Sequence, residues 1–342
     1  MDTPDEIKKK LPLSDKQRRF IESSRKLADQ IVNGATETIA IIMGPCSIHD
    51  ASLALEYARH LKSLAEKSSF FLVMRVYCEK PRTTIGWKGL LYDPYLNGTH
   101  DIATGIYWTR ELFLQLAEMG VASATEFLDP VVAPYIEDLI TWGFIGARTS
   151  SSQPHRQLAS SFSFPVGFKN CHAGDVNPAI HGVIAARSPH VFVSVGGDGK
   201  ICRKKSFGNN SSHIVLRGSS EKPNYDKKSV QDVLKAVHLH GIQSRLLIDC
   251  SHGNSQKKYE KQKDAFLCVM EQIAQGNHSI MGVMLESHLF EGNQALNEDV
   301  SSLAYGVSIT DPCIGWSTTL ELLSIAEELI SNSSSVIRFT QS

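Results

Sequence analysis

The sequence lacks the features that would place the protein in a membrane, in a disulfide-rich fold or on nucleic acid. No apolar run approaches the ~20 residues needed to span a bilayer. The seven cysteines are scattered and odd in number, and no two have C-x-x-C spacing, so we expect neither a disulfide framework nor a zinc knuckle. With a formal net charge of −1, the chain has no overall attraction to nucleic acid or to a membrane surface.

A signal for secretion is also missing. The opening stretch MDTPDEIKKK is charged and contains no apolar h-region, so we expect a cytoplasmic protein in a reducing compartment. With 42% hydrophobic and 21% charged residues, the composition is that of an ordinary globular protein. No linker, low-complexity stretch or internal repeat interrupts the chain. We therefore predict one domain over residues 37–342, preceded by an N-terminal extension over residues 1–36.

The N-terminal extension contains a helical pattern, SDKQRRFIESSRKLADQIVNG, over residues 14–34. Its apolar residues recur on one face, which is typical of an amphipathic helix that packs on a core. Ser14 or Asp15 can cap the start of this helix, and Gly34 can end it.

Nine short runs rich in β-branched and other apolar residues follow, most of them separated by helical patterns. Several are apolar almost throughout, as strands buried on both faces of a parallel sheet are. Strands alternating with helices over about 250 residues predict an α/β fold, a (β/α)8 TIM barrel, with an open doubly wound sheet as the alternative. The runs cover residues 38–43, 70–77, 121–127, 144–148, 165–169, 190–195, 213–218, 245–252 and 280–288.

One of these runs is in excess of the eight that a barrel needs. Residues 196–212 read GGDGKICRKKSFGNNSS, and this segment is too rich in Gly, Ser, Asn and charge to form a helix. Without a helical crossover, the run at 190–195 cannot lie parallel and next to the run at 213–218. We therefore predict a β-hairpin inserted before the sixth barrel strand.

Each predicted barrel strand has a charged or nucleophilic residue at or just after its C-terminal end. In a barrel these ends converge on one mouth, where the catalytic residues of this fold lie. We therefore predict a single site made of Cys46, Arg75, Lys80, Arg82, Glu126, Arg148, Lys169, Arg217, His252 and Glu286, with Asp311 further along the chain.

The residues of this site fall into two chemical groups. Six cations would repel one another unless anions lay among them, so they indicate more than one phosphate or carboxylate group on the substrates; they are Arg75, Lys80, Arg82, Arg148, Lys169 and Arg217. A thiolate, an imidazole and two carboxylates can bind a divalent transition metal, and this second group is Cys46, His252, Glu286 and Asp311. For any single residue, the alternative is a solvated charge, a packed cysteine, a structural histidine or an ion-paired acid.

Motifs at every predicted barrel strand resemble one enzyme family. They are GPCSIHD, MRVYCEKPRTTIGWKGL, GARTSSSQPHRQLAS, PVGFKN, HIVLRG, IDCSHGNS, GVMLESHLFEGNQ and YGVSITDPCIGW, and together they are similar to the class I 3-deoxy-D-arabino-heptulosonate 7-phosphate (DAHP) synthases. The resemblance implies a transferase that joins phosphoenolpyruvate to erythrose 4-phosphate on a (β/α)8 barrel with one divalent metal ion. This reaction opens the shikimate pathway to the aromatic amino acids. Manganese, iron, cobalt and zinc all suit the mixed ligands.

The resemblance also implies a role for each residue of the site. The metal ligands are Cys46, His252, Glu286 and Asp311; the phosphoenolpyruvate site is Arg75, Lys80, Arg148, Lys169 and Arg217, with Glu126 nearby; and the erythrose 4-phosphate site is Arg82 and Thr83. Lys80, His252 and Asp311 are then the catalytic residues. We expect Lys80, which lies between other cations, to have a lowered pKa and to protonate the acceptor oxygen. The family implies a homodimer or homotetramer.

Several loops depart from the usual family pattern. One reads ARTSSSQ where ARTTESQ is usual, and the loop after Lys169 reads NCHAGDV where NGTDG is usual. In feedback-inhibited members the hairpin helps to form an aromatic amino acid pocket. Leu158, Phe162, Ser163, Phe192 and Ser194 match pocket positions, Pro130 resembles the tyrosine-type pattern, and Lys204 replaces an apolar wall residue. A lysine beside an apolar ring is unfavourable unless it pairs or reaches solvent, so we expect an altered effector or none.

Two other functions stay open on the sequence. The altered loops fit a paralogue that uses a different acceptor sugar phosphate, although KPRTT argues against the synthase that uses arabinose 5-phosphate. The second is a catalytically silent paralogue that senses metabolites. A silent protein would not consume phosphoenolpyruvate with any metal.

Overall fold

The computed structural model describes residues 1–242, 245–297 and 299–340. The helices are α1 (Pro4–Lys10), α2 (Asp15–Val32), α3 (Ala51–Ala65), α4 (Ile102–Met119), α5 (Ala133–Ile136), α6 (Gln153–Ser160), α7 (Asn177–Arg187), α8 (Lys227–Leu239), α9 (Gln262–Ala274) and α10 (Trp316–Thr340), with 3-10 turns at Glu137–Leu139, Tyr259–Lys261 and Val300–Ser302. The strands are β1 (Ala40–Gly44), β2 (Phe71–Arg75), β3 (Ser123–Glu126), β4 (Trp142–Ile145), β5 (Val166–Lys169), β6 (Val191–Val195), β7 (Ile201–Lys205), β8 (Ser212–Leu216), β9 (Leu246–Asp249) and β10 (Ile280–Glu286).

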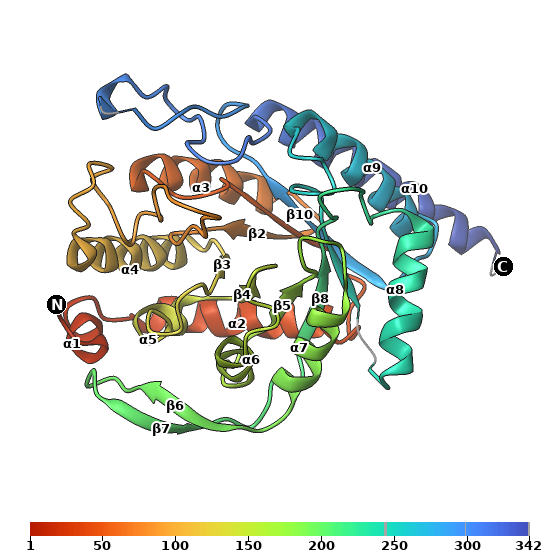
Figure 1. Cartoon of the computed structure of the whole chain (residues 1–342). Coiled ribbons are helices and arrows are strands. Elements are labelled where there is room, and N and C mark those ends of the chain that lie inside the picture. Colours follow the sequence, from red (N-terminus) through yellow and green to blue (C-terminus); the bar gives the residue numbers. More distant parts are fainter. Residues whose placement is uncertain (243–244, 298, 341–342) are drawn as a thin grey trace.

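Eight of these strands form a closed parallel barrel surrounded by helices, in the order β1-β10-β9-β8-β5-β4-β3-β2 (Figure 1). Strand β1 pairs in parallel with both β2 and β10, so the sheet has no free edge there. The predicted (β/α)8 barrel is confirmed, and the open doubly wound sheet is excluded. Strands β6 and β7 form a separate antiparallel hairpin between α7 and β8, as predicted.

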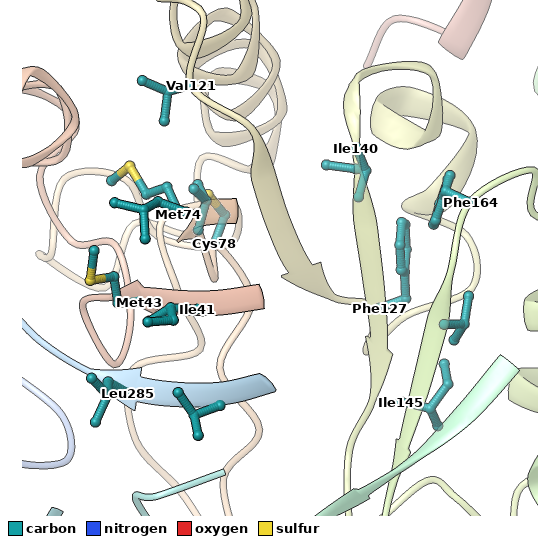
Figure 2. Packing of buried hydrophobic residues seen from close by; sticks show 14 of the residues in the cluster. Ile41, Met43, Met74, Cys78, Val121, Phe127, Ile140, Ile145, Phe164 and Leu285 are labelled. Atoms are coloured by element: carbon teal, nitrogen blue, oxygen red, sulfur yellow. The ribbon is translucent and has the colours of Figure 1, made fainter. Parts of the chain in front are cut away.

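The strands of the barrel alternate their side chains between two apolar layers. On β1, Ile41 and Met43 belong to the outer layer between strands and helices, whereas Ile42 belongs to the barrel interior. Figure 2 shows part of the outer layer. Met43 of β1 lies near Met74 of β2, and Leu285 lies on β10, the strand on the other side of β1. This alternation follows from the two-residue period of a strand, and it leaves the strand ends free to carry polar residues.

The predicted N-terminal helix is present as α2 and packs onto the interior of the barrel. Ser14 caps it with a reciprocal hydrogen-bond pair to Gln17, and its last turn places Ile31 and Val32 in the interior cluster. The sequence analysis missed α1, a seven-residue helix capped by Thr3. The division of the chain at residue 36 stays a prediction, and its end at 342 lies outside the described residues.

Strand β4 differs from its predicted position of 144–148. It runs from Trp142 to Ile145, because the backbone N–H groups of Thr149 and Ser150 both bond to the carbonyl of Gly146 and turn the chain there. Among the described helices, none has both the length and the apolar composition that crossing a membrane requires.

Candidate active site

The C-terminal ends of the barrel strands surround a cavity of about 220 Å³. The predicted site residues in its lining are Arg75, Lys80, Arg82, Thr83, Glu126, Arg148, Lys169, Arg217, His252 and Asp311. Cys46 and Glu286 are buried and contact this lining through Lys80 and Arg75. The structure therefore brings together all twelve predicted residues from loops and strand ends spread over 266 positions of the chain.

Three of the six cations have carboxylate partners, and three do not. The ion pairs are Arg75–Glu286 at 2.9 Å, Lys80–Asp311 at 3.4 Å and Lys169–Asp249 at 2.8 Å. Within the described residues, no ion pair to a carboxylate is formed by Arg82, Arg148 or Arg217. These three guanidinium groups are available to anionic ligands, and burial, with the charge of Arg148, lowers the pKa of Arg217 although the carboxylates of Asp249, Glu286 and Glu126 act to raise it.

Lys80 lies against two of the predicted metal ligands. Its Nζ is 2.7 Å from Sγ of Cys46 and 3.4 Å from Oδ2 of Asp311. The predicted lowering of the Lys80 pKa is wrong. Burial acts to lower it, but Cys46, Asp311 and Glu286 together outweigh burial and raise the pKa above its ordinary value. The same contact lowers the pKa of Asp311, because the Lys80 ammonium favours the charged carboxylate.

Three of the four predicted metal ligands form a compact cluster. Sγ of Cys46 and carboxylate oxygens of Glu286 and Asp311 all lie within 4.8 Å of one another. His252 is outside this cluster, with Nε2 at 3.7 Å from Oε1 of Glu286. A thiol and two carboxylates are a suitable donor set for a divalent transition metal, and an imidazole at this distance can complete it. Burial raises the pKa of the free Cys46 thiol to about 11.

Asp249 at the end of β9 is a site residue that the sequence analysis missed. Its fully buried carboxylate lies 2.8 Å from Nζ of Lys169 and 3.0 Å from Nδ1 of His252. Burial acts to raise its pKa, but Lys169 and His252 outweigh burial and lower it well below the ordinary value. An acid in the apolar run RLLIDCSH was the signal that could have identified it, because a buried carboxylate needs a partner.

Two further side chains, Tyr77 and Glu126, shape the cavity. The guanidinium of Arg75 lies over the ring of Tyr77, 3.6 Å from its centroid, which fixes the direction of the cation. Glu126 packs against Gly146, where an added Cβ would lie 2.1 Å from Oε1 of Glu126. Only glycine therefore permits the Glu126 carboxylate to occupy its place at the end of β3.

The unusual loop after β5 adds an imidazole to the cavity. His172 of NCHAGDV lines the cavity, as does Lys257. Burial and the charges of Arg217 and Arg148 lower the pKa of His172 to about 4, so the ring is neutral at neutral pH.

The predicted feedback positions are only partly brought together. Leu158, Phe192 and Ser194 line a separate cavity of about 450 Å³ between α6 and the hairpin, together with Pro130. Phe162 instead stacks on Phe164 and packs at a tilt against Phe127, and Ser163 accepts a hydrogen bond from Arg25. Lys204 does not line this cavity and forms an ion pair with Glu137 at 3.7 Å.

These features define a (β/α)8 enzyme whose mouth combines a cluster of metal-donor atoms with guanidinium groups that have no carboxylate partner in the described part of the chain. Comparison with known proteins is consistent with this class. Residues 10–324 match the model of the DAHP synthetase I family, and the chain belongs to that family. It is 46% identical over 323 residues to the Tyr-sensitive phospho-2-dehydro-3-deoxyheptonate aldolase of Escherichia coli strain K12. The matched residues cover 94% of this chain and 90% of that protein.

Two other relatives extend the comparison. The chain is 44% identical over 320 residues to a putative phospho-2-dehydro-3-deoxyheptonate aldolase of Schizosaccharomyces pombe, covering 93% of this chain and 87% of the relative. The solved structure of phospho-2-dehydro-3-deoxyheptonate aldolase from Francisella tularensis SCHU S4 superposes with a TM-score of 0.94 at 40% identity and covers 97% of both chains.

Proposed function

We propose that the protein is a DAHP synthase that condenses phosphoenolpyruvate with erythrose 4-phosphate in a metal-dependent reaction. The observation that supports this most is the meeting of unpaired Arg82, Arg148 and Arg217 with the donor atoms of Cys46, Glu286 and Asp311 around one cavity. Two phosphorylated substrates need such cations, because their own charges repel each other as they approach.

Phosphoenolpyruvate binds on the side of β2, β4, β5 and β8. Its phosphate and its carboxylate are both bound by the set of cations that the family resemblance implies, which is Arg75, Lys80, Arg148, Lys169 and Arg217. Arg75 keeps its charge when buried because Glu286 lies 2.9 Å away. In the empty site Arg75 is therefore still paired, and when the substrate enters it can bind a second anion. Lys169 is held in the same way by Asp249.

Erythrose 4-phosphate binds with its phosphate at Arg82 and Thr83. Nη2 of Arg148 donates a hydrogen bond of 2.9 Å to the Thr83 hydroxyl, so the two phosphate sites are linked through one contact. This link holds the two substrates side by side, with the acceptor aldehyde toward Lys80 and the donor cluster. The arrangement supplies the near-attack geometry that bimolecular condensation needs.

The chemistry forms a C–C bond at C3 of phosphoenolpyruvate and a C–O bond from water to C2, and it breaks the C–O bond between C2 and the phosphate. C3 attacks the aldehyde carbon, the aldehyde oxygen takes a proton, water adds at C2, and phosphate leaves. Of the two protons of the water, one replaces the proton taken by the aldehyde oxygen and the other leaves with the phosphate. A divalent ion held by Cys46, His252, Glu286 and Asp311 would polarise the acceptor aldehyde. Lys80 holds its proton next to these ligands and is the residue that we assign to protonate the acceptor oxygen.

The function is tested by following phosphoenolpyruvate consumption with erythrose 4-phosphate after chelation and again after Mn²⁺ is added. We expect turnover that chelation abolishes and metal restores. No turnover with any divalent metal would support the silent paralogue, and turnover only with another aldose phosphate would support the altered acceptor. For Lys80, we expect Lys80→Met to lower kcat by 10²–10⁴-fold while phosphoenolpyruvate still binds by calorimetry. A variant with normal kcat would remove Lys80 from the proton transfer.

A further inference from the structure

A second cavity lies on the outside of the barrel, between α3 and α4, whose packing against each other is visible in Figure 1. Its volume is about 530 Å³, which is within the range of small-molecule sites. Residues from the segments 90–96 and 300–305 complete its lining. It shares no lining residue with the cavity at the barrel mouth, so it is a separate feature of the molecule.

The walls of this α3–α4 cavity suit a flat apolar group. Tyr95 and Trp108 meet edge to face at 5.2 Å between ring centroids, and Tyr305 contributes a third ring. Leu55 and Leu112 supply aliphatic surface between them. Tyr95 and Tyr305 remain 46% and 58% exposed, so the aromatic wall is accessible from solvent. Offset and edge contacts with a ligand ring are favourable at such a wall.

The charges of the cavity favour a cation. Of the described residues in its lining, Asp50 and Glu111 are acidic and none is a lysine or an arginine. The Asp50 carboxylate already accepts hydrogen bonds from the backbone N–H groups of Ser52 and Leu53, where it caps α3. Glu111 forms no ion pair within the described part of the chain. An anion would be repelled here, whereas an ammonium group would find the Glu111 carboxylate.

A buried imidazole provides a further polar contact. His49 lines the cavity and is only 5% exposed, and its Nδ1 has no hydrogen-bond partner in the described residues. Its ring lies 5.9 Å from that of His288. A buried ring nitrogen without a partner is unfavourable, and it marks a place where a ligand or water completes the bonding. Burial keeps His49 neutral by lowering its pKa, so it adds no positive charge to the cavity.

We propose that the α3–α4 cavity binds a small aromatic amine, with the ring against Tyr95 and Trp108 and the ammonium group at Glu111. This ligand is distinct from the substrates proposed above and opposite to them in charge. Because His49 lies three residues beyond Cys46 in the same loop, an occupied cavity is connected through a short stretch of chain to the donor cluster.

The proposal is tested by isothermal titration of the full-length protein with 2-phenylethylamine, in the absence of both substrates. We expect saturable 1:1 binding. Two analogues of the same shape, 3-phenylpropionate and 2-phenylethanol, should bind at least tenfold more weakly, because the first reverses the charge and the second removes it. Equal binding of all three would overturn the charge argument. If the amine shows no saturable binding, the proposed site is overturned. The same conclusion holds if a second copy of the chain fills the cavity and thereby prevents the amine from binding.

Matched variants locate the binding site. Glu111→Gln should weaken 2-phenylethylamine binding about tenfold, equivalent to about 1.4 kcal/mol. Glu118→Gln, seven residues further on the same helix, is the control, because Glu118 pairs with Lys16 and does not line the cavity. Trp108→Leu should also weaken binding, since it removes part of the aromatic wall. An equal loss in Glu111→Gln and Glu118→Gln, or no loss in Glu111→Gln and Trp108→Leu, would overturn the assignment.

Discussion

The Glu79 carboxyl, next to Lys80 in the chain, predicts an unusual dependence of stability on pH. Glu79 is 3% exposed and accepts hydrogen bonds from the backbone N–H groups of Leu128 and Asp129 and from the hydroxyl of Tyr92. Burial raises its pKa from 4.5 to about 8. The folded protein therefore keeps a proton on Glu79 between these two values, while the unfolded chain loses it.

The sign of the effect follows from this difference. The stability associated with protonated Glu79 is fully present below pH 4.5 and is lost as pH rises to about 8. Each pKa unit corresponds to 1.36 kcal/mol, so the loss is on the order of 5 kcal/mol. With an unfolding entropy of about 2.1 cal/mol/K per residue, this corresponds to roughly 7 °C in Tm for a chain of this length.

Glu79→Gln tests this reasoning, because glutamine cannot ionise. Thermal unfolding followed by circular dichroism should show that, between pH 5 and pH 9, the Tm of the wild type falls by roughly 7 °C relative to the Tm of the variant. Glu271→Gln, at an exposed position on α9, controls for the loss of one negative charge. The reasoning is refuted if the Tm difference between Glu79→Gln and the wild type is the same at pH 5 and at pH 9.

Two further predictions concern the site. Asp249→Asn leaves the buried ammonium of Lys169 without its carboxylate, so urea titration should show a free energy of unfolding lowered by about 3–5 kcal/mol. Asp232→Asn, at an exposed ion pair, is the control and should lower the free energy of unfolding by less than about 1 kcal/mol. Similar losses in both variants would contradict the burial argument. The backbone nitrogen of Cys46 lies 3.4 Å from Sγ of Cys313, so oxidation of chelator-treated protein should inactivate it through these thiols, and Cys313→Ser should retain activity when metal is restored. Equal inactivation of the variant would exclude Cys313.

The barrel and the positions of most site residues could be predicted because both depend on local pattern. Apolar runs alternate with helical segments, and the residue that follows each run lies at the mouth once the barrel closes. The hairpin was predictable for a similar reason, since residues 196–212 have no helical character. The helix α1 was missed because seven residues with three lysines give too little periodicity to indicate a helix.

The electrostatics of the site could not be predicted from neighbours along the chain. Lys80 is followed closely by Arg82 in the sequence, which suggested a cationic environment and a lowered pKa. In the fold its nearest groups are Cys46 and Asp311, which are 34 and 231 residues away in the chain and raise the pKa. Asp249 escaped notice for the same reason, because its partner Lys169 is 80 residues away. Ionisation depends on contacts that only the closed barrel creates.

The two ends of the β6–β7 hairpin meet at one pair of residues, His190 and Ser206. The backbone N–H of Ser206 donates to the carbonyl of His190 at 2.9 Å, and the N–H of His190 donates to the Ser206 hydroxyl at 3.0 Å. Everything between these two residues lies outside the sheet of the barrel, and β5 pairs directly with β8 regardless of it. The hairpin can therefore be exchanged as a unit. A chimera that replaces residues 191–205 with those of a relative changes one wall of the cavity between α6 and the hairpin, while the eight-stranded barrel keeps its register.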